Sequence, residues 1–157
     1  MSDDAEAIRN LLYRYAECID AADFGGVAAL FADGAVSAPG MQEPARGVAA
    51  VERLYRSSSR VHEDGTLRTQ HLVLNPIVEV DAVVGTAIAR SRYVVLQATA
   101  KLPLQPIIAG RYRDRFERAG GIWRFALREI QIDLVGDLSE HLRFDLAETL
   151  DRADGES

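Results

Sequence analysis

His71 is the side chain in this 157-residue sequence whose type and position most suggest proton transfer. It lies in an alternating stretch on the same face as Thr69, Val73 and Asn75, a pattern that predicts a partly buried strand. Because an imidazole ionises near pH 6.5, such a histidine could act as a general base. It could equally be a core residue bonded to a backbone carbonyl, and its position alone leaves both interpretations open.

The other two histidines suggest less chemistry. His62 stands in a polar loop beside Glu63 and Asp64, where we expect solvation. His141 falls within the last predicted helix, where it would pack or cap, although it could reach a cavity mouth. The histidines lack metal-ligand spacing, and the sequence has neither HExxH nor a Cys/His cluster, so we expect no metal site. Glycine-rich nucleotide motifs are also missing, so we expect no cofactor.

Three charged residues are candidates for an inward position. Asp20 lies near the end of the first predicted helix, where an acid opposes the helix dipole and therefore suggests a cationic or imidazole partner elsewhere. Arg128 lies on an apolar strand face with Ala126, Ile130 and Ile132, which is costly unless it meets an anion or a buried carboxylate. Asp114 alternates with Tyr112 and Phe116 on one strand face, which suggests either an inward position or an ion pair with a neighbouring arginine.

These side chains would be positioned by helices followed by a meander of strands. Apolar spacing predicts helices over 4–22, after Asp23, and over 48–56, with a loop over 37–47. Alternation predicts four strands, and a final helix at about 138–150 follows the capping residue Asp137. We therefore expect one α+β domain over 1–157, a cone-shaped barrel with N-terminal helices packed on a curved, mostly antiparallel sheet. The four strands are expected at 67–80, 84–99, 107–118 and 122–135.

Composition excludes several classes of function. The net charge of -6, with 18 basic residues scattered among 24 acids, argues against nucleic-acid binding. No apolar run approaches the roughly 20 residues of a membrane-spanning helix, and the start lacks a signal-peptide pattern. The single cysteine fits a reducing compartment. We therefore expect a cytoplasmic protein that binds neither nucleic acid nor membrane.

Three strings resemble a known group of proteins. The segment from Ala7 through Asp20, with Leu30-Phe31-Ala32-Asp33, resembles the SnoaL-like branch of the nuclear-transport-factor-2-like superfamily. Arg68-Thr69-Gln70-His71 is similar to the corresponding string of scytalone dehydratase. Gly121-Ile122-Trp123-Arg124-Phe125, followed by Arg128, resembles the last-strand pattern of the branch.

The resemblance implies a pocket in which an Asp late in the first helix orients a His base. Carried over from scytalone dehydratase and hexachlorocyclohexane dehydrochlorinase, these are Asp20 and His71, with Arg128 matching an arginine of the dehydrochlorinase. Tyr93 occupies the position of the dehydratase's second histidine, so Tyr93 or Arg128 would assist the leaving group or an oxyanion. The implied function is a cofactor-independent, dehydratase-like lyase acting on a small apolar, cyclic molecule. An isomerase, a polyketide cyclase, a ligand-binding protein and a dioxygenase β-subunit-like partner remain alternatives.

The pocket lining is a further expectation, taken from the alternation of apolar residues. A homo-oligomer, dimer or trimer, is also expected, because arginines on the outer face of the third strand could pair with acids of a second subunit. The expected substrate-binding residues are Tyr15, Phe24, Phe31, Met41, Tyr55 and Trp123, and Leu104 is also expected to line the cavity.

Overall fold

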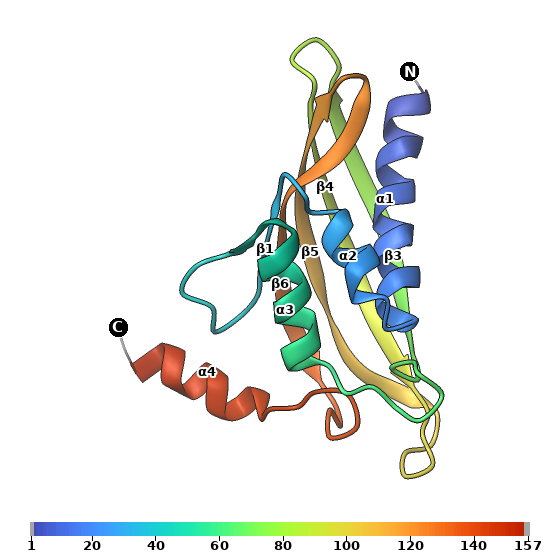
Figure 1. The fold of residues 1–157 in the computed structure, drawn as a ribbon, viewed down its shortest axis with the longest axis vertical. Helices are drawn as coiled ribbons and strands as arrows, with labels where there is room; N and C mark the ends of the chain where they lie inside the picture. The colour runs from blue at the N-terminus through green and yellow to red at the C-terminus, as the bar shows by residue number, and fades with distance from the viewer. Residues whose placement is uncertain (1, 156–157) are drawn as a thin grey trace.

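A computed structural model describes residues 2–155 and shows helices covering one face of a curved, six-stranded sheet (Figure 1). The first helix, α1 (Ser2–Asp20), lies along the sheet and buries Ile8, Leu12 and Ile19, which are spaced to form one stripe. It ends at Asp20 rather than at the predicted 22, because Ala22 has a left-handed backbone (φ 55°) that a helix cannot contain. The end of this helix is what places Asp20 beside the sheet.

Two further helices complete the cover. Asp23 caps α2 (Phe24–Ala29) by accepting a 2.8 Å hydrogen bond from the Gly26 N–H, as its residue type predicts. The helix α3 (Gly47–Ser58) buries Val51 and Tyr55 against α2 and the sheet. Within residues 2–155, no helix has both the length and the apolar character needed to cross a membrane.

The sheet has the strand order β2-β1-β6-β5-β4-β3 and does not close into a barrel. The predicted loop over 37–47 was partly wrong, because its ends belong to two short strands, β1 (Ala35–Ser37) and β2 (Ala45–Arg46), that pair with each other. β1 also runs parallel to β6, the one parallel pairing in the described sheet. The four predicted long strands are confirmed as β3 (Thr69–Asp81), β4 (Thr86–Gln97), β5 (Gln105–Ala119) and β6 (Ile122–Val135).

Bulges in the long strands set which side chains face the helices. The pairing shifts between Arg115 and Phe116 leave Ala126 as an extra residue in β6, so Arg128 shares its inward face with Phe125, not with Ala126 as predicted. A second irregularity at Asn75 (φ 53°) turns this residue outward, against the expectation that it shares a face with His71. Pro76 is tolerated beside it because β3 is an edge strand.

The predicted helix over 138–150 was only partly correct, because just residues 146–150 of it are helical. The chain from 138 to 145 makes turns instead, and α4 (Leu146–Gly155) begins where Asp145 accepts a hydrogen bond from the Ala147 N–H. Asp137 caps only a turn, through the Ser139 N–H. Backbone bonds to the residues after α3 explain the difference, since Leu142 forms a β-bridge with Ser59 and the two neighbouring residues also bond to that segment.

Candidate functional site

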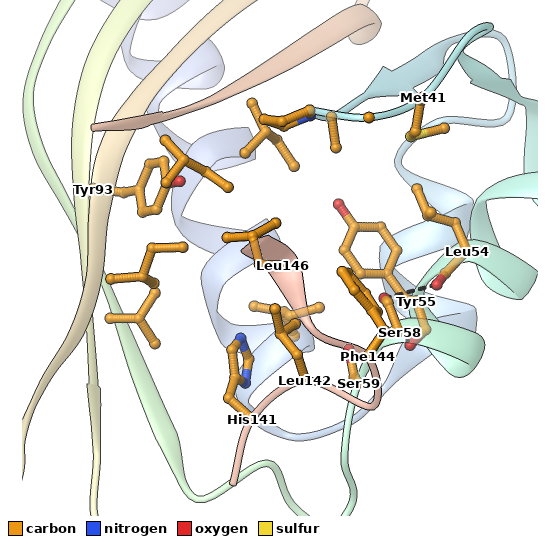
Figure 2. A pocket seen from close by; sticks show the side chains of 18 of the residues that line it. Met41, Leu54, Tyr55, Ser58, Ser59, Tyr93, His141, Leu142, Phe144 and Leu146 are labelled. Carbon is orange, nitrogen blue, oxygen red and sulfur yellow. Dashed lines mark hydrogen bonds between the residues drawn. The ribbon is translucent and has the colours of Figure 1, made fainter. Parts of the chain in front are cut away.

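A cavity of about 250 Å³ opens between the helices and the inner face of the sheet. Its walls come from α1, the loop at 38–41, the end of α3, the four long strands and the C-terminal segment 141–149. Figure 2 shows Met41, Tyr55 and Leu54 on one side of the cavity and Tyr93 on the other. His141 and Leu142 lie between them, in the lower part of the view. Most of the lining side chains are apolar, so the polar groups that remain are few and specific.

His71 and Asp20 meet at the wall of this cavity. The His71 Nδ1 lies 2.6 Å from Asp20 Oδ1, and the His71 backbone N–H donates to Asp20 Oδ2 at 2.9 Å. Thr69 Oγ1 donates to Asp20 Oδ1 at 2.7 Å. These donors offset the unfavourable position of a carboxylate at a helix C-terminus. The role of Thr69 was missed, although the alternation had placed it on the correct face.

The carboxylate determines which nitrogen of His71 is available. An ionised Asp20 can only accept, so the short bond puts the proton on Nδ1 and leaves a lone pair on Nε2. The imidazole side chain is 8% exposed and Asp20 is 23% exposed. No hydrogen bond to Nε2 is found among residues 2–155. The arrangement holds the imidazole ring in one tautomer, with Nε2 able to accept a hydrogen bond.

Four tyrosines also line the cavity. Tyr15 and Tyr55 share a hydrogen bond of 2.6 Å between their hydroxyls, and the Tyr93 hydroxyl donates to the Gln131 carbonyl at 3.0 Å. Tyr112 stacks on Tyr93 with 4.4 Å between ring centroids. Burial raises the pKa of all four tyrosines, so they stay neutral and can only act as hydrogen-bonding groups.

Arg128 lies beneath this wall and outside the cavity lining. It is fully buried and donates to both carboxylate oxygens of Asp114, at 2.8 and 2.9 Å. Its guanidinium is covered by the rings of Tyr112 and Tyr15, at 3.7 and 4.2 Å from their centroids. The expectation that Arg128 contacts a leaving group is therefore wrong, because the paired carboxylate and the rings enclose it. The alternative of a buried carboxylate partner is confirmed.

His141 does reach the cavity, and its place beside His71 was not predicted. The two ring centroids are 6.0 Å apart. His62 is also more than a solvated loop residue, because its Nε2 lies 2.8 Å from the Glu140 carbonyl oxygen and helps hold the segment that carries His141. The sequence analysis allowed His141 to reach a cavity mouth, but no pattern in the sequence indicated that it would lie beside His71.

Three of the six predicted substrate-binding residues line the cavity, namely Tyr15, Met41 and Tyr55. The other three belong to the core. Phe31 packs between Tyr15 and Phe125, and Phe24 lies under Arg56. Trp123 donates its indole N–H to Asp4 at 2.8 Å, at the far end of α1. Leu104 is 70% exposed on the surface. Alternation identified inward faces, and it could not tell the filled end of the cone from the open end.

No group of three or more His, Cys, Asp or Glu side chains suited to a metal ion occurs among residues 2–155. The polar side chains that line the cavity are imidazoles and hydroxyls, and the Asp20 carboxylate bonds to one of these imidazoles, that of His71. They can exchange protons and donate hydrogen bonds, which are the operations that the activation of a weakly acidic C–H bond requires.

Similarity to solved structures supports the fold. The chain is 26% identical to Rv3472, a Mycobacterium tuberculosis protein of unknown function, over 98% of this chain and 89% of that one, with a TM-score of 0.71. It is 25% identical to a nuclear-transport-factor-2-like protein of Novosphingobium aromaticivorans with a cystatin-like fold, over 83% and 82% of the two chains, with a TM-score of 0.68. No curated protein matches it.

A hexachlorocyclohexane dehydrochlorinase of Novosphingobium barchaimii shares the fold at 18% identity, over 87% of this chain and 91% of that one, with a TM-score of 0.67. At that identity the likeness concerns the architecture alone. The family model for the SnoaL-like domain matches residues 1–129, most of the chain, including both members of the His–Asp pair. The α+β cone, its cavity and this match together show that the chain belongs to the SnoaL-like domain family.

Proposed function

We propose that the protein is a cofactor-independent lyase that removes a proton and a leaving group from a small apolar, cyclic substrate. The observation that carries the proposal is the 2.6 Å contact between His71 Nδ1 and Asp20 Oδ1 at the cavity wall. Had the two side chains lain beyond hydrogen-bond reach, or faced away from the cavity, a binding protein would have been the better interpretation.

In the proposed reaction, His71 Nε2 takes a proton from a substrate carbon. The electron pair of that C–H bond forms a double bond to the neighbouring carbon, from which a hydroxide or halide departs with its own electron pair. Asp20 stabilises the imidazolium through the Nδ1–H bond. The imidazolium then gives its proton to the departing hydroxide, which leaves as water, or to solvent. Tyr93 forms part of the cavity wall and is not assigned a proton-donating role, because its hydroxyl proton is already donated to the Gln131 carbonyl.

The size of the cavity supports the substrate class. An apolar cavity of about 150 Å³ holds benzene, and this one measures about 250 Å³. One ring with substituents, or two fused rings, therefore fits it. Residues such as Leu54, Ile130 and Leu146 favour a hydrocarbon framework over a sugar or a charged metabolite.

The first experiment measures proton abstraction separately from elimination. A tetralone in deuterium oxide reports exchange of its α-protons by NMR, and a tetralone with a hydroxyl group β to the carbonyl becomes a naphthol on loss of water. We expect wild-type protein to catalyse both processes, and His71→Ala and Asp20→Asn to lose them by roughly 10²-fold or more. The matched control is Asp33→Asn, which removes an exposed carboxylate paired with Arg124 on the surface.

Each of the other outcomes identifies a different function. Exchange without loss of water would favour an isomerase or cyclase of the same fold. Tight binding of the tetralone with no exchange above buffer would favour a ligand-binding protein. Exchange that survives His71→Ala unchanged would refute the assignment of the base.

Association between copies of the chain is also proposed. The outer face of the sheet carries exposed apolar side chains on β3 and β4, including Leu72, Leu74 and Ile77, beside Arg113 and Arg115. Glu79 and Glu129 lie on the same face, so it is complementary in charge to a second copy of itself. Sedimentation equilibrium should show a dimer or trimer that dissociates in an Ile77→Glu variant, whereas a wild-type monomer would contradict the proposal.

A further inference from the structure

The outer face of the sheet brings together arginines that are scattered along the chain. Arg90 on β4 stands directly opposite Arg113 on β5. Arg92 and Arg111 form a second such pair, two residues further along the strands. Like charges placed opposite one another in a sheet destabilise it. These four residues, called the arginine block below, make one part of the surface basic in a chain whose net charge is -6.

A groove separates the two arginine pairs. The residues between them, Ser91 and Tyr112, are paired with each other and turn their buried side chains into the core, which leaves backbone at the outer surface. Because alternate residues of a strand are about 6–7 Å apart, the gap between the pairs is about that wide. All four arginines line the resulting groove, whose volume is about 290 Å³. This spacing suits a compact ligand that is held from both sides.

Only half of the arginine block is neutralised by the protein. Arg111 donates to both oxygens of Asp133, at 2.8 and 2.9 Å, and the Arg90 guanidinium lies 3.6 Å from Glu79. The other two arginines of the block have no carboxylate oxygen within 4 Å among residues 2–155. The block therefore keeps an excess of two positive charges.

The two unpaired arginines, Arg92 and Arg113, come from different strands and from opposite sides of the groove. Diagonal neighbours in a sheet are about 7–8 Å apart, so two long side chains can reach one ligand between them. Glu129 lies across from Arg113 on β6, but it lines the adjacent hollow with Arg115, where their charges offset one another. No acidic side chain of residues 2–155 lines the groove itself.

The bulge in β3 supplies a third wall. The left-handed backbone of Asn75 (φ 53°) turns this residue outward, and Asn75 and Ile77 both line the groove. Bulges re-aim side chains and are common beside functional sites. The amide of Asn75 can donate to an anion. Ile77 gives the groove an apolar side that an organic group can contact.

We propose that this groove binds a phosphate dianion, either free or as the phosphate group of a small molecule. A guanidinium presents two parallel N–H donors that match two oxygens of a phosphate. A phosphate monoester carries about -1.5 to -2 charges at pH 7, which matches the excess of two on the arginine block. The site lies on the opposite face of the sheet from the His71 cavity, so the inference does not depend on the reaction proposed there.

The test compares thermal unfolding in sodium phosphate with unfolding in sodium chloride of equal ionic strength and pH. Phosphate at ten times its dissociation constant should raise Tm by roughly 3–6 °C above the chloride value. In calorimetric titrations, Arg92→Gln and Arg113→Gln should each weaken phosphate binding about tenfold or more. Arg92→Lys should recover only part of the affinity, because an ammonium group lacks the planar fork. The matched control is Arg56→Gln, which removes an exposed arginine paired with Glu52 on α3.

A second readout needs no ligand. Removing one arginine of an opposed pair relieves repulsion, so in chloride Arg92→Gln should unfold at the wild-type temperature or above it. Phenyl phosphate distinguishes the two sources of the dianion, since severalfold tighter binding than inorganic phosphate would assign a phosphate ester and equal binding would assign free phosphate. A Tm rise that is no larger in phosphate than in chloride, or that survives Arg92→Gln and Arg113→Gln, would overturn the inference. Binding of heparin that phosphate does not displace would also overturn it, because that result indicates a polymeric partner.

Discussion

The buried ion pair between Asp114 and Arg128 offers the most direct check on the structure. Both side chains are 0% exposed, two bonds of 2.8 and 2.9 Å join them, and Tyr112 and Tyr15 cover the guanidinium. We consider three variants: Asp114→Leu, Arg128→Met, and the double substitution. Leucine and methionine keep much of the volume, so the comparison concerns charge more than packing.

The expected costs are unequal. Asp114→Leu leaves a guanidinium that cannot lose its proton in a protein, so we expect a loss of about 3–5 kcal/mol. At roughly 2–4 °C per kcal/mol for a chain of this size, Tm should fall by about 6–20 °C. Arg128→Met should cost less, because a carboxyl can take up a proton. Burial already raises the pKa of Asp114, and removing Arg128 deletes the charge that opposes this rise.

The assay is urea unfolding at pH 7, analysed as a double-mutant cycle. We expect the double variant to be more stable than Asp114→Leu by about 2 kcal/mol or more, since no unpaired charge remains. The deficit of Arg128→Met should narrow between pH 7 and pH 5, because a raised Asp114 pKa favours the folded state as protons become available. A cost for Asp114→Leu below about 1 kcal/mol, or a double variant whose loss equals the sum of the singles, would refute the reasoning.

Other predictions concern single side chains around the cavity. Thr69→Val removes the 2.7 Å bond to Asp20 and should lower stability by about 1 kcal/mol and slow tetralone exchange, both compared with wild type by urea unfolding and NMR. The pKa of His141 in the folded protein is about 3, below its value in the unfolded chain, so the unfolded chain binds a proton first as the pH falls. The free energy of unfolding of the wild type should therefore decline between about pH 6.5 and pH 3, by up to about 1.4 kcal/mol per pH unit. His141→Leu should lose this part of the pH dependence. Gly110→Ala places a methyl group against the Gln131 carbonyl and 2.6 Å from the Tyr93 hydroxyl. It should therefore destabilise the fold by about 1–3 kcal/mol in thermal unfolding and weaken tetralone binding. Unchanged stability and binding would contradict the pairing register of β5 and β6.

Local patterns predicted much of this architecture because they depend on residues close together in the chain. The 3.6-residue period placed α1, and strict alternation placed the inward face of β5 with Tyr112, Asp114 and Phe116. Alternation also assigned His71 to the inner face. It was less reliable where a bulge shifts the register, as at Ala126 and Asn75, because one extra residue reverses every later side chain.

The C-terminal segment shows how tertiary contacts override a local pattern. Leucines at positions 138, 142, 146 and 150 have helical spacing, yet only the last two lie in α4. The backbone bonds of residues 141–143 go to residues 58–60 at the end of α3, and no pattern within the segment itself reveals that these residues lie nearby. The displacement of this segment from a helix is what brings His141 into the cavity.

The sequence alone determined the fold class and the inward face that carries His71. It also identified two unusually placed charges, Asp20 near the end of a helix and Arg128 on an apolar strand face. Tertiary structure decided the partners. Asp20 bonds to a strand about fifty positions away, Arg128 pairs across the sheet with Asp114, and His141 arrives from the end of the chain. The reason is that periodicity specifies the direction of a side chain relative to its own element, whereas a site depends on how separate elements meet.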